Sequence, residues 1–292
     1  MAKLNRGFNQ VALNGSVGAV TYVYRKSTTI AKQKVPPHVK AKQTPRLMAT
    51  RMRWANLIRM WKALNSVGWH PSFNSVEGLQ SDYNAFVKRN FSRSPVFLPK
   101  DVVLQGGGVV GAAQVTEGEL PSIGGTMVSG VFTSTLNMGG TTVSASTTLK
   151  SFSDAIIDNN SDWQNGDQLT LVLLVQGGSL TAPVISPKIH EITLNTEDEE
   201  TLLADIMEVN YLSVSNGKLG LGGHVVGGAC FVHSRETADG TIVSTEQLAV
   251  SNEETLEQYQ GSTAFEKAVN SYGGFASSQY LTPNINQIIV AG

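Results

Sequence analysis

The spacing closest to a known chemical motif belongs to the glycine-rich stretch 106–111, which follows the apolar run 102–104. Its sequence, Gly-Gly-Gly-Val-Val-Gly, satisfies G-x-G-x-x-G, which lets backbone approach the pyrophosphate of a dinucleotide. Gly118 and Pro121 interrupt the segment before a crossover helix could form, and no acid lies about 20 residues beyond the motif. We therefore interpret the stretch as a turn or bulge, and we expect no cofactor.

A second candidate is the stretch 158–162, in which Asp158, Asn160 and Asp162 alternate as they would in a calcium loop. The sixth position is Trp163, where glycine is needed, and the twelfth is Leu169, where a bidentate glutamate is needed. The five histidines show no metal-binding spacing either. We therefore predict no metal site.

Nucleophilic chemistry is not indicated. Cys230 is the single cysteine, which excludes an intrachain disulfide framework and a cysteine-based zinc site. Its context, Gly-Ala-Cys-Phe-Val, predicts a buried strand thiol. The order of the serines, histidines and aspartates reveals no catalytic arrangement, so we expect no catalytic residues and no enzyme.

The charges are distributed unevenly along the 292-residue chain. The first 76 residues contain 13 Lys and Arg and no Asp or Glu, so the other residues carry the remaining 9 of the 22 basic side chains and all 23 acids. Such asymmetry indicates a polyanionic partner, or contact with the acidic body of a neighbouring subunit. The alternative is a basic arm folded back on its own acidic domain.

The basic region ends in a predicted amphipathic helix over 44–65. Thr44 is a suitable N-cap, and Pro45 suits the first helical position. Apolar residues recur at helical spacing, and we expect this stripe to pack in a core or an interface. Its residues are Leu47, Trp54, Leu57, Ile58, Trp61 and Leu64.

Basic side chains of the arm and the helix are the expected contacts to an assembly partner or an anionic surface. They are Arg25, Lys26, Lys32, Lys34, Lys40, Lys42, Arg46, Arg51, Arg53 and Arg59. Tyr22, Tyr24, Trp54 and Trp61 lie among these cations and could stack on single-stranded nucleic acid. Because Trp54 and Trp61 are seven residues apart on the apolar stripe, we favour a packing role for them and phosphate contact by Lys and Arg.

The elements around this helix define three regions. Residues 1–43 read as an extended basic N-terminal arm with short strands, including a hairpin at Asn14-Gly15 and an extended segment at 32–42 imposed by Pro36 and Pro37. Residues 44–93 form a helical segment whose second helix, around 79–90, should pack on the first. Residues 94–292 alternate in hydrophobicity between turn residues, which predicts a β-rich body.

The predicted fold class is therefore α+β, mainly β, with an antiparallel sandwich or barrel-like body and a few helices. The run 167–176 is the most apolar and should be a central strand. Helices are expected at 151–159, 197–208 and 253–270, and strands at 126–137, 141–149, 188–194, 209–215, 224–234, 241–250 and 285–290. With no signal-peptide pattern and no apolar run of about 18 residues, we expect synthesis in a cytosol and no membrane span.

Several stretches resemble a family of virion-associated proteins from Bacteroidetes phages, including crAss-like gut phages, and related Bacteroidetes proteins. They are residues 1–10 and 15–22, the helix bearing Thr44, Arg51 and Trp54, and residues 82–88, 114–123, 234–235, 239–240, 244–246 and 277–281. The resemblance implies a virion context and carries over no site residues.

The expected function is a structural subunit of a tailed bacteriophage virion, from the tail or a head-to-tail ring or tube assembly. Its partners would be further copies of itself, other virion proteins and packaged or transiting DNA, with assembly in the bacterial host cytoplasm. A capsid-associated head auxiliary protein is one alternative. A non-sequence-specific nucleic-acid-binding protein acting through its basic N-terminal region is the other.

Overall fold

The computed structural model describes residues 2–4, 15–25, 28–33, 44–73, 81–93 and 95–272. The chain divides into two compact units. The first contains Met1–Gln43 with Glu77–Ser81, and the second contains Thr44–Val76 with Asp82–Gly292. Within the described residues, the first unit is a small sheet, and the second holds the helices and the other strands.

The first unit contains an antiparallel sheet in the order β1 (Ala2–Leu4), β4 (Thr28–Gln33), β3 (Val20–Arg25) and β2 (Gly15–Val17). The aromatic and β-branched run 19–25 thus supplies a strand, as predicted. The turn before it contains Gly18, whose φ of 57° suits glycine, whereas Gly15 of the expected Asn-Gly turn begins β2. The expected extended segment lies outside the described residues from position 34 onward.

In the second unit, helix α1 (Pro45–Ser66) begins where the sequence predicts. The Thr44 hydroxyl accepts a hydrogen bond from the backbone N–H of Leu47 at 3.3 Å, so the predicted N-cap is confirmed. The expected second helix is α2 (Asp82–Asn90), and it packs against α1.

Two buried asparagines attach these helices to the neighbouring backbone. Asn56 on α1 donates to the Val109 carbonyl at 2.9 Å and accepts from the Val109 N–H at 2.8 Å. Asn90, at the end of α2, donates to the Gln114 carbonyl at 2.8 Å and accepts from its N–H at 2.6 Å. Each side-chain amide therefore supplies the two hydrogen bonds that a neighbouring strand would make, and it pairs backbone groups that burial would otherwise leave unpaired.

The main sheet is antiparallel, and its long strands lie at one side. The order is β11 (Ala182–Thr193), β10 (Gln168–Ser179), β14 (Gly227–Thr237), β16 (Leu248–Ser251) and β6 (Ala113–Gln114), and β15 (Gly240–Val243) also pairs with β14. Strand β10 has a partner on both sides, so the predicted central strand is confirmed. Leu169 and Leu171 face one hydrophobic core, whereas Val172 and Leu174 face another. This burial on both faces explains why the run does not alternate.

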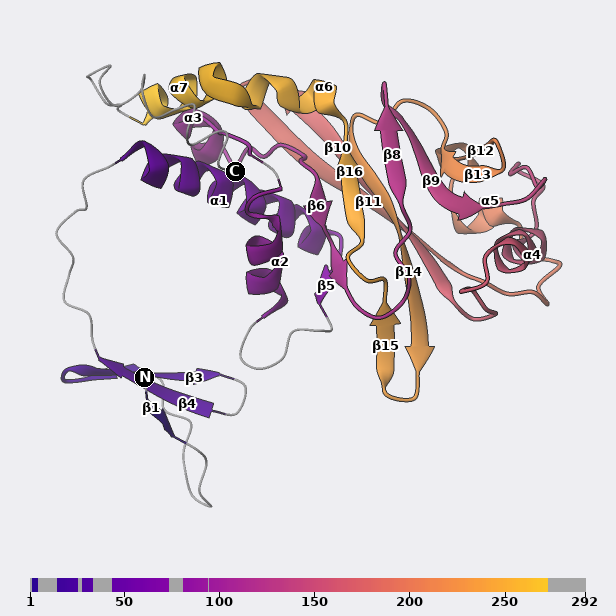
Figure 1. Cartoon of the computed structure of the whole chain (residues 1–292), viewed down its shortest axis with the longest axis horizontal. Helices are drawn as coiled ribbons and strands as arrows, with labels where there is room; N and C mark the ends of the chain where they lie inside the picture. The colour runs from indigo at the N-terminus through magenta and orange to yellow at the C-terminus, as the bar shows by residue number, and fades with distance from the viewer. Residues whose placement is uncertain are drawn as a thin grey trace. The chain divides into compact units, whose positions relative to one another are not determined.

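Different layers cover the two faces of this sheet. Helices α1 and α2 lie over one face, where Leu57 and Phe86 pack with Val172 and Cys230 (Figure 1). Over the other face lie helix α4 (Leu149–Asn159) and a second antiparallel sheet. Its order is β12 (Leu212–Ser215), β13 (Lys218–Leu221), β9 (Val131–Asn137) and β8 (Gly125–Val128).

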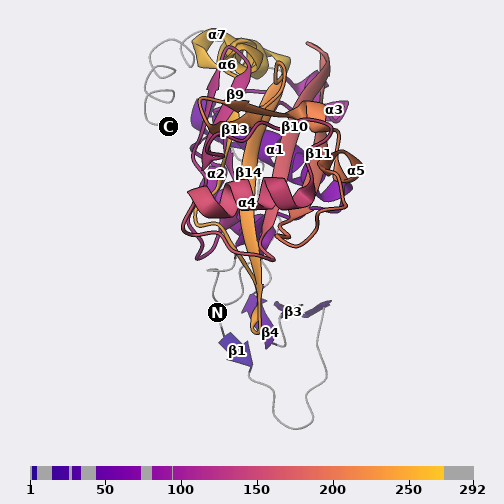
Figure 2. The same ribbon diagram turned by 90° about the vertical axis from the view of Figure 1, so that its right-hand side faces the viewer.

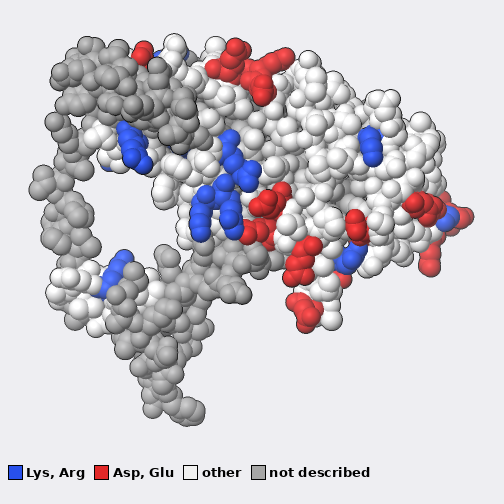
Figure 3. Space-filling model, in the orientation of Figure 1, with Lys and Arg blue, Asp and Glu red and all other residues white. Residues whose placement is uncertain are grey.

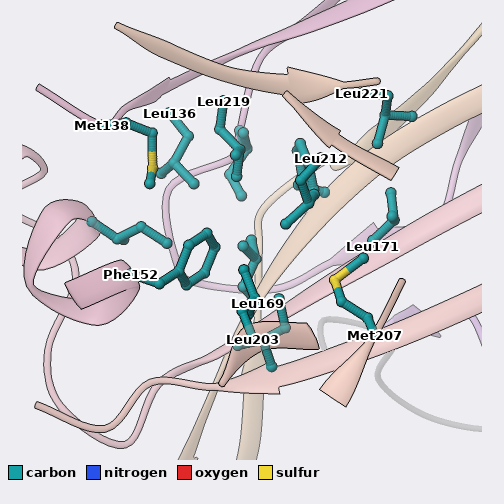
Figure 4. Close-up of a cluster of buried hydrophobic side chains, with 14 of the residues drawn as sticks. Leu136, Met138, Phe152, Leu169, Leu171, Leu203, Met207, Leu212, Leu219 and Leu221 are labelled. Carbon is teal, nitrogen blue, oxygen red and sulfur yellow. The ribbon is translucent and has the colours of Figure 1, made fainter. Parts of the chain in front are cut away.

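The core between these layers contains Phe152 of α4, Leu169 of β10 and Leu219 of β13 (Figure 4). Helix α4 lies across the end of the unit that faces the viewer in Figure 2. The short strands β5 (Ser72–Phe73) and β7 (Thr116–Glu117) form a parallel pair. The fold is thus α+β and mainly antiparallel β, as predicted, and its sheets are open, so the barrel-like alternative is wrong.

Some predicted elements are shorter or missing. The helix expected at 197–208 is reduced to α5 (Leu203–Ile206), because the Asp198 carboxylate accepts bonds from the N–H groups of Glu200 and Thr201 and holds a turn. The helix expected at 253–270 is broken at Gly261, whose φ is 80°. It comprises α6 (Glu253–Leu256), the 3₁₀ turn η2 (Glu257–Tyr259) and α7 (Gly261–Ser271).

Further differences concern strands and connections. No strand forms at 141–149, which is described throughout, and the strand expected at 285–290 lies outside the described residues. The 3₁₀ turn η1 (Val209–Tyr211) precedes β12. Helix α3 (Lys100–Leu104) leads into the glycine-rich stretch, and no helix follows it there. The predicted turn is therefore confirmed.

The edge strand β11 carries two prolines, Pro183 and Pro187, in its twelve residues. The Pro183 carbonyl accepts a bond from the Gly108 N–H, so its polar groups face away from β10. Pro187, four residues further, faces the same way, because strand residues of equal parity share an orientation. Neither proline can donate a ladder hydrogen bond, which protects this long edge against pairing with another strand.

Candidate assembly surface

Helix α1 buries a stripe different from the one its tryptophans predict. The buried residues on it include Met48, Met52, Leu57, Met60 and Leu64. Methionine has a flexible side chain and fills irregular space between packed elements. The stripe of 47, 54, 58 and 61 therefore lies further round the helix, away from the deepest packing.

The predicted packing residues separate accordingly. Leu57 and Leu64 are buried, as expected, and Leu47, Ile58 and Trp61 are half-buried. Trp54 is 45% exposed, so it does not lie in a core of this chain, and the interface role expected for it stays a prediction. The physical reason is competition between two apolar stripes on one helix, which spacing alone does not resolve.

The exposed tryptophan belongs to an aromatic group that joins α1 and α2. Trp61 packs edge-on against Tyr83, with ring centroids 5.7 Å apart, and also contacts Phe86 at 5.5 Å. The indole N–H of Trp54 donates to the Tyr83 hydroxyl at 3.3 Å. Trp61 thus fixes the helix pair, whereas Trp54 presents much of its ring to solvent.

Exposed cations lie on the same helix. Arg46, Arg51 and Lys62 are exposed, and none makes an ion pair with a described residue. We define the α1 face as Arg51, Trp54, Lys62 and Tyr83. It contains tryptophan, tyrosine and arginine, the residue types that are enriched in the energetic centres of protein interfaces.

The cations predicted in the arm belong to the first unit. Lys32 is exposed on β4, and Arg25 ends β3, although its side chain is not described. Lys26, Lys34, Lys40 and Lys42 lie outside the described residues.

Arg59 is not the surface cation we expected. It is half-buried, and its Nη2 donates to the Val103 carbonyl at the end of α3 at 3.0 Å. A Cβ at Gly108 would lie only 2.7 Å from the Cβ of Arg59. Close packing against α1 thus explains the glycine at position 108, and a bound phosphate is not needed to explain it.

Arg53 also differs from the expectation, because it is only 7% exposed. Its guanidinium carbon lies 5.9 Å from the ring centroid of Phe91 and 5.8 Å from that of Phe97. Its Nε and Nη2 have no hydrogen-bond partner in the described part of the chain, and burial lowers the pKa of this arginine. The aromatic rings compensate part of the desolvation, so Arg53 has a packing position.

Another charged cluster lies within the second unit, around Asp167. This buried carboxylate accepts bonds from Arg235 Nε at 2.6 Å, Arg235 Nη2 at 2.7 Å, His233 Nε2 at 2.8 Å and the Gln164 N–H at 3.0 Å. His233 stacks on Trp163, with ring centroids 3.7 Å apart. The cluster joins the turn before β10 to the neighbouring strand β14.

Among the described residues, no serine, threonine or cysteine side chain hydrogen-bonds the ring of His233 in the Asp167 cluster. The Ser244 hydroxyl accepts from the backbone N–H of His233 at 2.9 Å, and His233 contacts the carboxylate through its ring. Burial lowers the pKa of His233 more than its hydrogen bond to Asp167 raises it. Burial also acts to raise the pKa of Asp167, but the bonds from Arg235, Gln164 and His233 outweigh it and hold that pKa below its usual range. The cluster is a buried structural ion pair.

A shallow hollow lies beside α4, at the opposite end of the second unit from α1 (Figure 1). Acidic side chains gather at this end of the unit (Figure 3). The hollow has a volume of about 530 Å³, and Asp154, Asp158, Glu199 and Lys150 contribute to its lining. Lys150 pairs with Asp154 at 3.0 Å and donates to the Thr196 carbonyl at 2.9 Å. Asp158 and Glu199 are exposed and make no ion pair with a described residue.

The sequence did not point to this hollow. The sequence singled out Asp158 only as a candidate calcium ligand. Asn160, from the same stretch, is not free to bind a cation, because its amide donates to and accepts from the backbone of Asn137. The i,i+4 spacing of Asp154 and Asp158 on a predicted helix was the one available signal. No group of His, Cys, Asp or Glu suited to a metal ion occurs among the described residues.

No family model, curated protein or solved structure matches the chain. No helix in the described part of the chain is long and apolar enough to cross a membrane. Burial raises the pKa of the Cys230 thiol, in keeping with the strand position predicted for it.

Proposed function

We propose that the protein is a structural subunit of a tailed-phage virion, from the tail or a head-to-tail ring or tube assembly. The observation that carries the proposal is the α1 face, where Trp54 is 45% exposed beside cations that form no ion pair with a described residue. Tryptophan, tyrosine and arginine are the residue types that most often dominate the binding energy of protein interfaces. The resemblance to virion-associated proteins supplies the particle as its setting.

The first unit supports the same proposal. Its described strands are three to six residues long, and the described side chains among them are half-buried or exposed. A sheet of this size has little apolar surface to bury by itself, so it gains stability from contact with a neighbour. In a virion, assembled in the bacterial host cytoplasm, the neighbour would be another copy or another virion protein.

Native mass measurement and negative-stain images of the purified full-length chain test the proposal. We expect closed rings or short tubes of fixed stoichiometry, since a heterologous contact that closes on itself forms a ring. A protein that stays monomeric at high concentration, and beside the other virion proteins, would contradict it. Attachment to the outside of the head would favour the capsid-associated alternative.

A nucleic-acid-binding role is the second candidate, favoured by the absence of acids from the first 76 residues. Binding through phosphates would weaken steeply with salt, with a log–log slope of roughly −0.9 per phosphate on duplex DNA. Gel retardation of unrelated duplexes at several salt concentrations tests this role. Failure to retard any duplex at low salt would exclude it.

A further inference from the structure

We propose that the α1 face of one copy docks on the acidic hollow beside α4 of a second copy. The inference rests on the proposed function and names the two surfaces that meet in the assembly. The first surface is Arg51, Trp54, Lys62 and Tyr83, and the second is lined by Asp154, Asp158 and Glu199.

The α1 face has the charge and shape of an inserting surface. Arg51 and Lys62 have no carboxylate partner among the described residues, so their charges are available to another molecule. Trp54 is held by its hydrogen bond to Tyr83, which reduces the entropy lost when the ring is buried by a partner. The face thus presents Trp54, Tyr83 and Arg51, residue types that are enriched among interface hot spots.

The hollow beside α4 has the complementary charge. Lys150 is its one lining cation among the described residues, and Asp154 already neutralises it. Asp158 and Glu199 form no ion pair within the described residues, and with Asp154 they outnumber Lys150, so the hollow presents net negative charge to solvent. A carboxylate and a guanidinium form a bidentate, charge-assisted pair, which fixes orientation as well as adding affinity.

The positions of the two surfaces determine the kind of assembly. Both belong to the second unit, and α1 and α4 lie at opposite ends of it, on different sides of the main sheet (Figure 1). The two surfaces of one copy therefore cannot contact each other. When two copies dock, one still has a free hollow and the other a free α1 face. The result is a head-to-tail arrangement, which closes into a ring or continues as a tube.

Charge reversal tests the contact sharply. The first variant carries Arg51→Glu with Lys62→Glu, and the second carries Asp158→Lys with Glu199→Lys. Each alone should weaken self-association at least about tenfold in analytical ultracentrifugation, because like charges then face each other. Mixing the two variants should restore assembly with alternating subunits, since each reversed face meets its new complement on the other variant. Lys267→Glu and Glu257→Lys, at exposed positions of α7 and η2, are the matched controls and should assemble like the parent.

The outcomes separate this inference from the proposed function. If the parent assembles but neither double variant weakens it, the contact is elsewhere and the inference is wrong, whereas the structural role stands. If the purified parent is monomeric at high concentration, the inference is wrong, and the proposed function fails as well if the protein also stays monomeric beside the other virion proteins. If the Arg51 and Lys62 changes abolish DNA retardation and leave self-association intact, the α1 face binds nucleic acid, and the inference is overturned. Circular dichroism of each variant checks that loss of assembly does not reflect unfolding.

Discussion

The indole of Trp54 donates a hydrogen bond to the Tyr83 hydroxyl at 3.3 Å, at the exposed side of the contact between α1 and α2. The same tyrosine ring packs against Trp61. Tyr83 thus holds one tryptophan inside the helix pair and another at its surface.

The two sides of α1 should respond differently to truncation. Trp54→Ala should lower the free energy of unfolding by at most about 1 kcal/mol, because nearly half of the side chain is already solvated. Leu57→Ala should cost about 2–5 kcal/mol, because Leu57 is 1% exposed. Urea unfolding of both variants measures the difference. Equal losses would mean that Trp54 is packed after all.

The buried guanidinium of Arg53 should be dispensable for stability. Arg53→Met keeps a long side chain between Phe91 and Phe97 and removes a charge whose Nε and Nη2 have no partner. We expect the free energy of unfolding to stay equal or to rise by about 1–4 kcal/mol. Arg53→Ala is the control, since it removes both the charge and the contacts and should destabilise. The prediction is wrong if Met and Ala cost the same.

The Asp167 cluster should be sensitive to loss of its carboxylate charge. Asp167→Asn leaves Arg235 and His233 without their anion and should cost about 3 kcal/mol. This is the lower end of the usual range, because the Arg235 side chain is 22% exposed and partly solvated. Denaturant unfolding at neutral pH measures it, with Asp239→Asn in the exposed β14–β15 turn as the control.

The same cluster predicts lower stability in acid. The pKa of His233 is lowered by burial, so the unfolded chain binds a proton more readily, and stability falls as the pH drops below about 6.5. The pKa of Asp167 is also below its usual range, so a second loss begins near pH 4 as the unfolded chain takes up that proton. Unfolding midpoints measured between pH 3 and 8 should show both losses. Asp167→Asn should flatten the second one, and an unchanged acid limb would contradict the assignment.

The side-chain amide of Asn56 should contribute to stability by pairing the buried backbone groups of Val109. Asn56→Ala leaves the N–H and carbonyl of Val109 buried without these bonds, and each such group costs about 1–3 kcal/mol. Asn270→Ala, at an exposed position of α7, is the control and should change stability little. Chemical unfolding distinguishes them, and similar values for the two variants would show that Asn56 is not needed.

Local signals explain which parts of the fold could be predicted. The capped start of α1 and the two-sided apolar run of β10 are specified by neighbouring residues, so both were identified. The side of α1 that is buried was not identified, because its methionine stripe and its tryptophan stripe are both apolar. Only packing against the rest of the fold decides which stripe is buried. The turn at Asp198 was not predicted, because acidic residues such as those at 197–200 are also typical of the first turn of a helix.

The candidate site was predicted in part for the same reason. The basic helix is one continuous segment, so Arg51 could be associated with an anionic partner, whereas Lys62 was not among the predicted contacts. The interior positions of Arg53 and Arg59 depend on Phe97 and Val103, which are distant in sequence. The hollow combines α4 with Glu199. Residues this far apart share no periodicity that a single sequence reveals.

Pro183 and Pro187 on the edge strand β11 bear on how crowded copies avoid misassembly. Two copies that collide along this edge cannot form a continuous ladder, because Pro187 has no N–H to donate and the Pro183 carbonyl is already bonded to the Gly108 N–H. The two copies therefore separate quickly, and each stays free to meet the correct partner. Replacing both prolines with threonine would remove this kinetic safeguard and favour fibrous aggregation over ordered growth.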